Sequence, residues 1–187
     1  MVTLSLRKPS DAALSALLST ARVESLSYVE VGATQGELPG GYRHDRFDVD
    51  LGPDGDGRFE RARDALRAWR PQVGAGLRVV PSDPVHQDQT FVLVMHFGPL
   101  YVLAPGRVVT VIDTPERFAF AYGTLQSHPE KGEESFAIAR DDGRVLFTVV
   151  AFSRPRHVLA RLGAPVARLV QRRVTRAYLA AMQADAS

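Results

Sequence analysis

A short acidic stretch holds the side chains best suited to chemistry, the run HPEKGEE at residues 128–134. It places the imidazole of His128 two residues before the carboxylate of Glu130, with Glu134 close behind. Groups this near to each other can set each other's pKa and form an acid–base pair that handles protons or an anion. The alternative is a polar hairpin loop whose charges are simply solvated.

The same stretch offers ligand types for a divalent cation, but a metal site needs at least three converging ligands. The chain has no HExxH or similar spacing and no Cys. We therefore expect no metal and no other cofactor. A Ser–His–Asp order, a P-loop and a GxGxxG motif are also absent, so the sequence supports no covalent hydrolase, nucleoside triphosphatase or Rossmann enzyme.

Arg154 is the cation best placed to meet these carboxylates. The turn signal Asp141-Asp142-Gly143 predicts a hairpin in which Glu134 lies opposite about Phe152, close to Arg154. Arg154 is expected to pair with Glu133 or Glu134. Such a buried pair serves structure as readily as it would contact a ligand, and the sequence leaves both open.

The segment Phe152-Ser153-Arg154-Pro155 is predicted to join the last strand to the terminal helix. Ser153 can cap the free N–H groups of that helix, and Pro155 suits its first turn.

Tyr122 could line a pocket with its phenol, although aromatic residues at strand spacing usually belong to a core. The alternation around it predicts one large and one small face, Phe118, Phe120 and Tyr122 against Ala119, Ala121 and Gly123. The small face is expected to receive a packed helix, with room for a ligand as the alternative. The candidate ligand-binding residues are therefore Tyr122, His128, Glu130, Glu134 and Arg154.

Glycine and proline mark the organisation of the chain. Residues 9–21 predict a helix with polar capping residues at its start, and residues 32–41 read as a connecting loop. We expect residues 1–41 to form an N-terminal helix and linker, and residues 42–187 to form the main domain.

The main domain begins with a strand and a helix. Residues 43–51 alternate as a strand, with charges on both faces, and its more apolar face carries Arg43, Asp45, Phe47, Val49 and Leu51. After an emphatic turn at 52–57, the apolar stripe of a helix ends at Pro71.

From residue 77 the hydrophobic period changes from helical to two. Turn signals, including residues 104–106 and 141–143, separate short strands and predict an antiparallel meander. The expected strands are 77–80, 91–97, 100–103, 108–112, 118–124, 135–140 and 145–152.

The chain ends in a predicted amphipathic helix that Gly163 and Pro165 should kink or split. Its apolar stripe comprises Leu159, Leu162, Val166, Leu169, Val170, Val174, Ala177 and Ala181. Seven arginines and no acidic residue lie between Arg154 and Tyr178, a pattern that fits either a solvated basic face or an anionic partner. Aromatic residues are not interleaved with these arginines, which argues against nucleic acid.

The order strand, helix, meander and long terminal helix indicates an α+β domain. A curved antiparallel sheet wrapped around the terminal helix would bury both apolar faces. This order resembles the helix-grip fold of the Bet v 1, START and polyketide-cyclase group. The resemblance implies an apolar ligand held between sheet and helix, and it concerns the fold alone.

Several motifs over residues 28–179 are similar to a more specific family. They are LPGGY at 38–42, GAGL at 74–77, YGTL at 122–125, HPEKGEESF at 128–136 and FSRP at 152–155. They resemble uncharacterised protein family 0548, a bacterial and plant domain of unknown function, although Ser127 stands where that pattern has Gly. The resemblance implies no catalytic residues.

Composition sets the remaining bounds. Of 187 residues, 45% are hydrophobic and 24% charged, which suits one globular domain with a real core. The chain has no signal-peptide pattern and no apolar run long enough to span a membrane, so we expect a cytoplasmic protein. Nothing in the sequence specifies an oligomeric state.

Three functions remain, in descending order of support. The first is a small-molecule binding module for an apolar or amphipathic ligand. The second is a cyclase- or lyase-type enzyme that uses His128 and a nearby carboxylate. The third is an interaction protein that uses the arginine-rich helix on an anionic partner.

Overall fold

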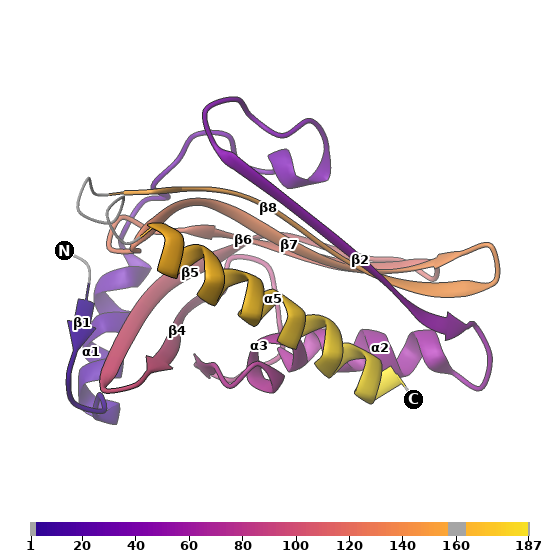
Figure 1. The fold of residues 1–187 in the computed structure, drawn as a ribbon, viewed down its shortest axis with the longest axis horizontal. Helices are drawn as coiled ribbons and strands as arrows, with labels where there is room; N and C mark the ends of the chain where they lie inside the picture. The colour runs from indigo at the N-terminus through magenta and orange to yellow at the C-terminus, as the bar shows by residue number, and fades with distance from the viewer. Residues whose placement is uncertain (1–2, 157–163, 187) are drawn as a thin grey trace.

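A computed structural model describes the backbone of residues 3–156 and 164–186 and the side chains of residues 4–156 and 173–186 (Figure 1). Long antiparallel strands form a curved sheet, and the terminal helix crosses one of its faces. The elements are β1 (Thr3–Ser5), α1 (Asp11–Arg22), the 3₁₀ turn η1 (Ala33–Gln35), β2 (Arg43–Pro53), α2 (Arg58–Arg67), α3 (Arg70–Gly74), β3 (Arg78–Val80), β4 (Thr90–Phe97), β5 (Leu100–Asp113), β6 (Arg117–Thr124), β7 (Glu130–Asp141), β8 (Arg144–Pro155) and α5 (Ala164–Ala186).

The sheet is a meander closed by one long-range pairing. Its order is β2-β8-β7-β6-β5-β4-β3, and β1 adds to β5. Strands β3 to β8 follow one another, whereas β2 pairs with β8, far away in the sequence. Along β2 the residues Arg43 to Leu51 alternate between half-buried or buried and exposed, as the sequence predicts. The expected meander and terminal helix are confirmed.

The predicted hairpin between β7 and β8 is also present. Asp141 pairs with Arg144, so Asp142 and Gly143 form a two-residue loop, and both have a positive φ, 46° and 72°. Such a loop matches the twist of the flanking strands. Glu134 pairs with Ala151, one residue from the predicted Phe152.

One predicted turn is absent. Residues 104–106 lie inside the single long strand β5, not between two strands. Proline is tolerated there because the partner of β5 changes on one side: the pairing of β5 with β1 ends at Leu103, and its pairing with β6 begins at Gly106. Gly106 adds no side chain, and a Cβ there would come within 2.7 Å of the Phe91 ring.

The predicted helix start at Ser153 and Pro155 is wrong. Both residues belong to β8, because the strand continues along β2 and β7 to its last residues. Helix α5 is described from Ala164, so Pro165 stands at the start of its described part. The expected kink or split at Gly163 and Pro165 falls at the border of the described residues and stays a prediction. Gly163, Leu159 and Leu162 lie outside the described residues.

Helix α5 supplies the centre of the core, although its buried stripe differs from the prediction. The described positions that are fully buried are Thr175, Tyr178, Met182 and Ala186. The predicted Val174, Ala177 and Ala181 are only half-buried beside them. The predicted Val166, Leu169 and Val170 have side chains outside the described residues.

Helices α2 and α3 complete the core beneath α5 (Figure 1). The helical conformation is interrupted between α2 and α3 at Trp69. Pro71 therefore lies in the first turn of α3 and does not end a helix. Trp69 is buried against the rings of Phe91 and Phe120 at 4.8 and 5.1 Å between centroids. Trp69 therefore joins α2 and α3 to the face of the sheet that α5 covers.

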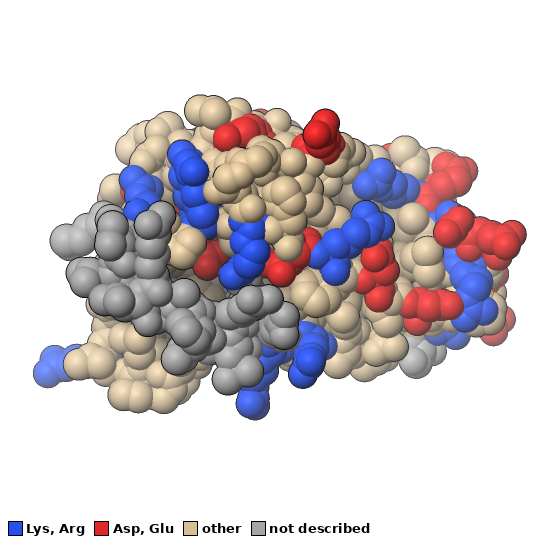
Figure 2. Space-filling model, turned by 45° about the horizontal axis from the view of Figure 1, so that its top comes forward, with Lys and Arg blue, Asp and Glu red and all other residues tan. Residues whose placement is uncertain are grey.

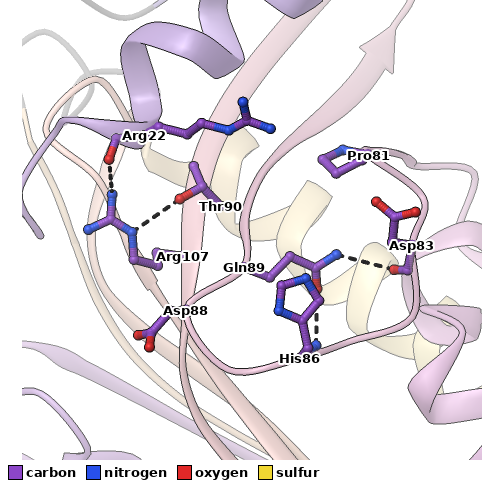
Figure 3. Close-up of a pocket in the computed structure, with 8 residues that line it drawn as sticks. All are labelled: Arg22, Pro81, Asp83, His86, Asp88, Gln89, Thr90 and Arg107. Atoms are coloured by element: carbon purple, nitrogen blue, oxygen red, sulfur yellow. Dashed lines mark hydrogen bonds between the residues drawn. The ribbon is translucent and has the colours of Figure 1, made fainter.

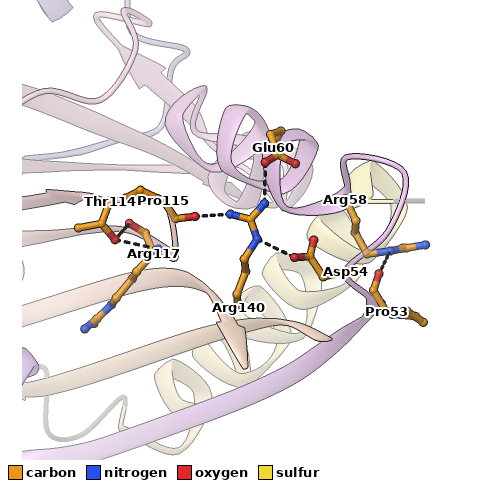
Figure 4. Close-up of polar contacts among 8 residues, drawn as sticks. All are labelled: Pro53, Asp54, Arg58, Glu60, Thr114, Pro115, Arg117 and Arg140. Atoms are coloured by element: carbon orange, nitrogen blue, oxygen red, sulfur yellow. Dashed lines mark hydrogen bonds and ion pairs between the residues drawn. The ribbon is translucent and has the colours of Figure 1, made fainter. Parts of the chain in front are cut away.

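Arginine side chains hold α2 to the far end of the sheet (Figure 4). Arg140 on β7 donates to Asp54 Oδ2 and to Glu60 Oε1, each at 2.6 Å, and also to the Pro115 carbonyl. Its guanidinium lies over the Phe59 ring, 4.1 Å from the centroid. These pairs are partly exposed, so each contributes little to the free energy of unfolding. Their main effect is to fix the position of α2 relative to β7.

The N-terminal residues pack onto the outer face of the sheet, with α1 over β4 and β5. Leu14 and Leu18 of α1 join Val92, Val94 and Leu103 in a second apolar cluster. On the small face of β6, the Tyr28 ring takes the space above Gly123, where a Cβ would lie 2.2 Å from its hydroxyl oxygen. A loop residue, and not the predicted packed helix, therefore covers this part of β6.

Candidate functional site

Polar side chains gather on the α5-facing side of the sheet, at the end where β7 begins and β8 ends. The alternation that turns Tyr122, Phe136 and Ile138 toward the core brings these polar residues to the same face. The helix-facing polar cluster comprises Arg43 and Asp45 of β2, Tyr122 of β6, Glu130 and Glu134 of β7, Ser153 of β8 and Tyr178 of α5.

Glu134 lies at the centre of this cluster. Tyr122 donates a hydrogen bond to its Oε2, and Tyr178 interacts with Tyr122. Glu134 is half-buried. Its partial removal from water, together with the negative charges of Glu130 and Asp45, raises its pKa to about 7 against the opposing effect of the Tyr122 hydrogen bond. Burial also raises the pKa of both tyrosines well above the usual value, so they remain neutral donors.

The rest of the cluster surrounds Glu130. Arg43 donates from Nε to Asp45 Oδ2 at 2.9 Å and from Nη2 to Ser153 Oγ at 3.3 Å. Burial raises the pKa of Glu130, and the Arg43 charge and the Ser153 hydroxyl oppose that rise. Two carboxyl groups with raised pKa values thus share one face of β7, near a single described guanidinium.

His128 occupies the turn before β7, and its side chain bonds to the backbone of that turn. Its Nδ1 accepts the backbone N–H of Glu130 at 2.9 Å, which orders the start of the strand. Burial lowers the pKa of His128 to about 4, and the nearby Arg156 charge adds to that effect. His128 is therefore neutral near pH 7. The predicted acid–base pair requires a carboxylate beside the imidazole, but the Nδ1 of His128 is bonded to a backbone amide instead.

Arg154 and Glu133 lie on the opposite face of the sheet from Glu134. The Arg154 guanidinium lies over the Tyr42 ring, 4.5 Å from its centroid, in place of the expected pairing with Glu133 or Glu134. Glu133 instead receives hydrogen bonds from the N-terminal segment. Of the five candidate residues, the structure brings together Tyr122, Glu130 and Glu134.

A protein-family model described as a domain of unknown function, DUF1990, matches residues 27–181. The chain belongs to this family. A UPF0548 protein of Deinococcus radiodurans is 37% identical over 92% of this chain and 93% of its own length. A UPF0548 protein of Arabidopsis thaliana is 33% identical over 65% of this chain and 64% of its own. The resemblance carried by the sequence motifs is confirmed.

Among solved structures, the hypothetical protein jhp0584 of Helicobacter pylori is similar to this DUF1990 chain in fold. The two align with a TM-score of 0.59 at 12% identity, over 88% of this chain and 98% of the other. At that identity the likeness concerns architecture alone. No helix within the described residues is long and apolar enough to cross a membrane.

The sequence does not identify four members of the helix-facing polar cluster as site residues: Arg43, Asp45, Ser153 and Tyr178. For Arg43 and Asp45 a signal existed, since both are charged residues on the more apolar face of a strand. Ser153 matches a helix-capping residue in sequence, so the sequence does not indicate that it belongs to β8. Tyr178 gave no signal, because only the fold brings it beside Tyr122.

A separate surface pocket of about 530 Å³ lies between α1 and the loop before β4 (Figure 3). Its polar groups mostly bond to other groups of the chain: Arg107 donates to the carbonyls that end α1, and Gln89 donates to Asp83 O.

No group of three or more His, Asp or Glu side chains within the described part of the chain is arranged to hold a metal ion.

Replacing Glu134 by Gln is expected to stabilise the DUF1990 fold at alkaline pH. Because the folded-state pKa lies above the unfolded value of 4.5, this carboxyl stabilises the fold below pH 4.5, and that stability is lost as pH rises through 7. The variant should exceed the natural protein by up to about 3 kcal/mol at pH 8 and match it at pH 4.

Urea unfolding at both pH values measures this difference. A variant that is less stable at pH 8 would contradict the raised pKa. The neutral His128 also makes the fold less stable as pH falls from 6.5 toward 4. This loss is equal in both proteins, so it cancels when their free energies of unfolding are compared.

Proposed function

We propose that this protein is a small-molecule binding module that holds an amphipathic ligand between the sheet and α5. The polar end of the ligand lies at the helix-facing polar cluster. The observation that carries the proposal is the contrast between two adjacent residues of β7, Glu133 and Glu134, on opposite faces of the sheet.

Glu133 is a carboxylate whose surroundings are complete. It accepts from the Tyr28 hydroxyl at 2.6 Å, the Gly32 N–H at 2.8 Å, and both the N–H and the hydroxyl of Thr34, at 3.1 and 2.5 Å. Four donors of this kind stabilise the charge of a buried carboxylate and explain why an acidic residue is present there.

Glu134 lacks such surroundings. Among the described residues its carboxylate has one hydrogen-bond partner, Tyr122, and no ion pair. Placing an acidic group on the core face of a sheet without full compensation costs stability, since a well-packed apolar side chain would serve the fold better. Local sacrifices of this kind are typical of functional sites. A ligand that bonds to Glu134 would supply the missing partners.

The apolar part of the ligand has suitable neighbours beside the cluster. The Tyr122 ring packs against Phe91, Phe136 and Trp69 at centroid distances of 5.1, 5.8 and 6.4 Å. Ligand sites commonly combine aromatic walls with a few convergent polar groups of this kind. The proposed site thus offers one polar end and one apolar wall.

Native mass spectrometry of the protein purified gently from its own host tests the proposal. We expect an excess mass that denaturation releases, and a large loss of that mass in Glu134→Gln. The matched control is Glu116→Gln, a change at an exposed glutamate outside the cluster, which should retain the ligand. A clean unliganded mass for the natural protein, confirmed by extraction of the same sample, would overturn the proposal.

Other surfaces give less support for a macromolecular partner. Figure 2 shows Lys and Arg side chains interspersed with Asp and Glu over the face that it displays. Arg173 and Arg176 are exposed on α5, as a solvated basic face requires. The side chains of Arg161, Arg168 and Arg172 lie outside the described residues.

A further inference from the structure

The charges of the helix-facing polar cluster are unequal. Its described members include three carboxyl groups, those of Asp45, Glu130 and Glu134, and the single guanidinium of Arg43. Arg43 lies nearest Asp45, with 2.9 Å between Nε and Oδ2. The cluster therefore carries more negative than positive charge at any pH at which Glu130 and Glu134 are ionised.

The hydrogen-bonding capacity of the cluster is unequal in the same sense. Ionised carboxylates only accept hydrogen bonds, and the Tyr122 hydroxyl already donates its one proton to Glu134. A carboxylate or phosphate head would add acceptors beside acceptors and would repel Glu130 and Glu134. An ammonium head brings three donors and one positive charge, which matches what the cluster lacks.

We propose that the polar head of the ligand is a protonated amine that binds between Glu130 and Glu134, next to Tyr122. The inference rests on the proposed function, because it names the chemical class of the ligand at that site. It assigns a specificity role to Glu130 and Glu134: their charges select amines over alcohols and acids with the same hydrocarbon chain.

Three probes of equal chain length separate this inference from the function on which it rests. Decylamine, decanol and decanoate share the apolar part and differ only in the head group. The chain has a single tryptophan, Trp69, which is buried beside Tyr122, so its fluorescence reports occupation of the site. Titrations at pH 8, below the aggregation threshold of each probe, give the three affinities.

We expect decylamine to bind at least about tenfold more tightly than decanol, and decanoate to bind most weakly. In Glu130→Gln combined with Glu134→Gln, the preference of decylamine over decanol should disappear while decanol still binds. The same combination at exposed positions, Glu37→Gln with Glu116→Gln, should keep the preference.

The pH dependence gives a second readout. The preference for decylamine should grow between pH 6 and pH 8, since Glu134 ionises near pH 7 while the amine stays protonated. The described charged or titratable groups that face Glu134 are Asp45, Glu130 and Arg43, with Tyr122 and Tyr178. Burial raises the pKa of Glu130, so its ionisation adds negative charge as the pH rises and acts in the same direction as Glu134. Burial also raises the pKa of both tyrosines well above the usual value, so they stay neutral over this range. A preference independent of pH would contradict the role of Glu134.

The outcomes are distinguishable. If decanol or decanoate binds as tightly as decylamine, the amine inference is overturned and the binding function stands. If none of the three probes binds and the protein from its host carries no ligand, the proposed function fails, and the inference fails with it.

Discussion

Replacing Glu133 by Ala is expected to cost about 3–5 kcal/mol of the free energy of unfolding, a large part of the stability of a domain this size. The side chain is 3% exposed and joins β7 to a segment about 100 residues earlier. Its removal leaves the Tyr28 hydroxyl, the Gly32 N–H and both Thr34 donors without an acceptor. Urea unfolding at pH 7 measures the loss.

Two further variants separate the charge from the shape of this carboxylate. In Glu133→Gln the amide nitrogen must face a backbone N–H in either orientation, because one carboxylate oxygen of Glu133 accepts the Gly32 N–H and the other accepts the Thr34 N–H. A loss of about 2–3 kcal/mol is therefore expected even for this nearly isosteric change. The neighbouring Glu134→Gln should change stability at pH 8 in the opposite direction. Equal effects at the two positions would refute the assignment of Glu133 as the structural carboxylate.

Replacing Gly132 by Ala is expected to prevent normal folding or to cost at least about 4 kcal/mol. Gly132 has a φ of 153°, and a Cβ there would lie 1.9 Å from the Phe152 carbonyl oxygen. The obstacle is the backbone of the neighbouring strand, so no rotamer change relieves it. The Gly132 N–H also donates to Thr124 Oγ1 at 2.9 Å, which fixes its position.

A glycine without such contacts provides the control for this variant. Gly40 is exposed, its φ lies outside the left-handed region, and nothing lies within 4 Å of a Cβ built there. Gly40→Ala should leave the unfolding midpoint almost unchanged, and circular dichroism with urea unfolding compares the two. A Gly132→Ala protein as stable as the Gly40→Ala protein would show that the β7–β8 pairing differs from the one described.

Much of the fold could be predicted because local patterns and tertiary structure agree. The alternation at Arg43–Leu51 and the Asp142-Gly143 loop identify a strand and a hairpin without knowledge of their partners. Errors arose where one residue type suits two environments. Pro105 resembles a turn residue and lies in a strand where the paired neighbour changes, and Ser153 resembles a helix cap and lies in β8.

The candidate site could be predicted only in part, for a related reason. Tyr122, Glu130 and Glu134 share one short region of the chain, where a run of polar residues attracts notice. Tyr178 joins them only because α5 crosses the sheet, and Asp45 only because β2 pairs with β8. Neighbouring residues of a strand always point to opposite faces, but the sequence could not show which of Glu133 and Glu134 faces α5 until the register of β7 was known.

The pairing of β2 with β8 has a consequence for synthesis on the ribosome. Residues 43–53 emerge early, yet the strand that completes their hydrogen bonds spans residues 144–155. The Tyr28 hydroxyl likewise waits for Glu133, 105 residues later. Because such long loops must close before these contacts form, the N-terminal third cannot fold as it emerges. The nascent chain therefore carries an unpaired strand until most of the protein has been made, and this is the stage at which a chaperone would bind it.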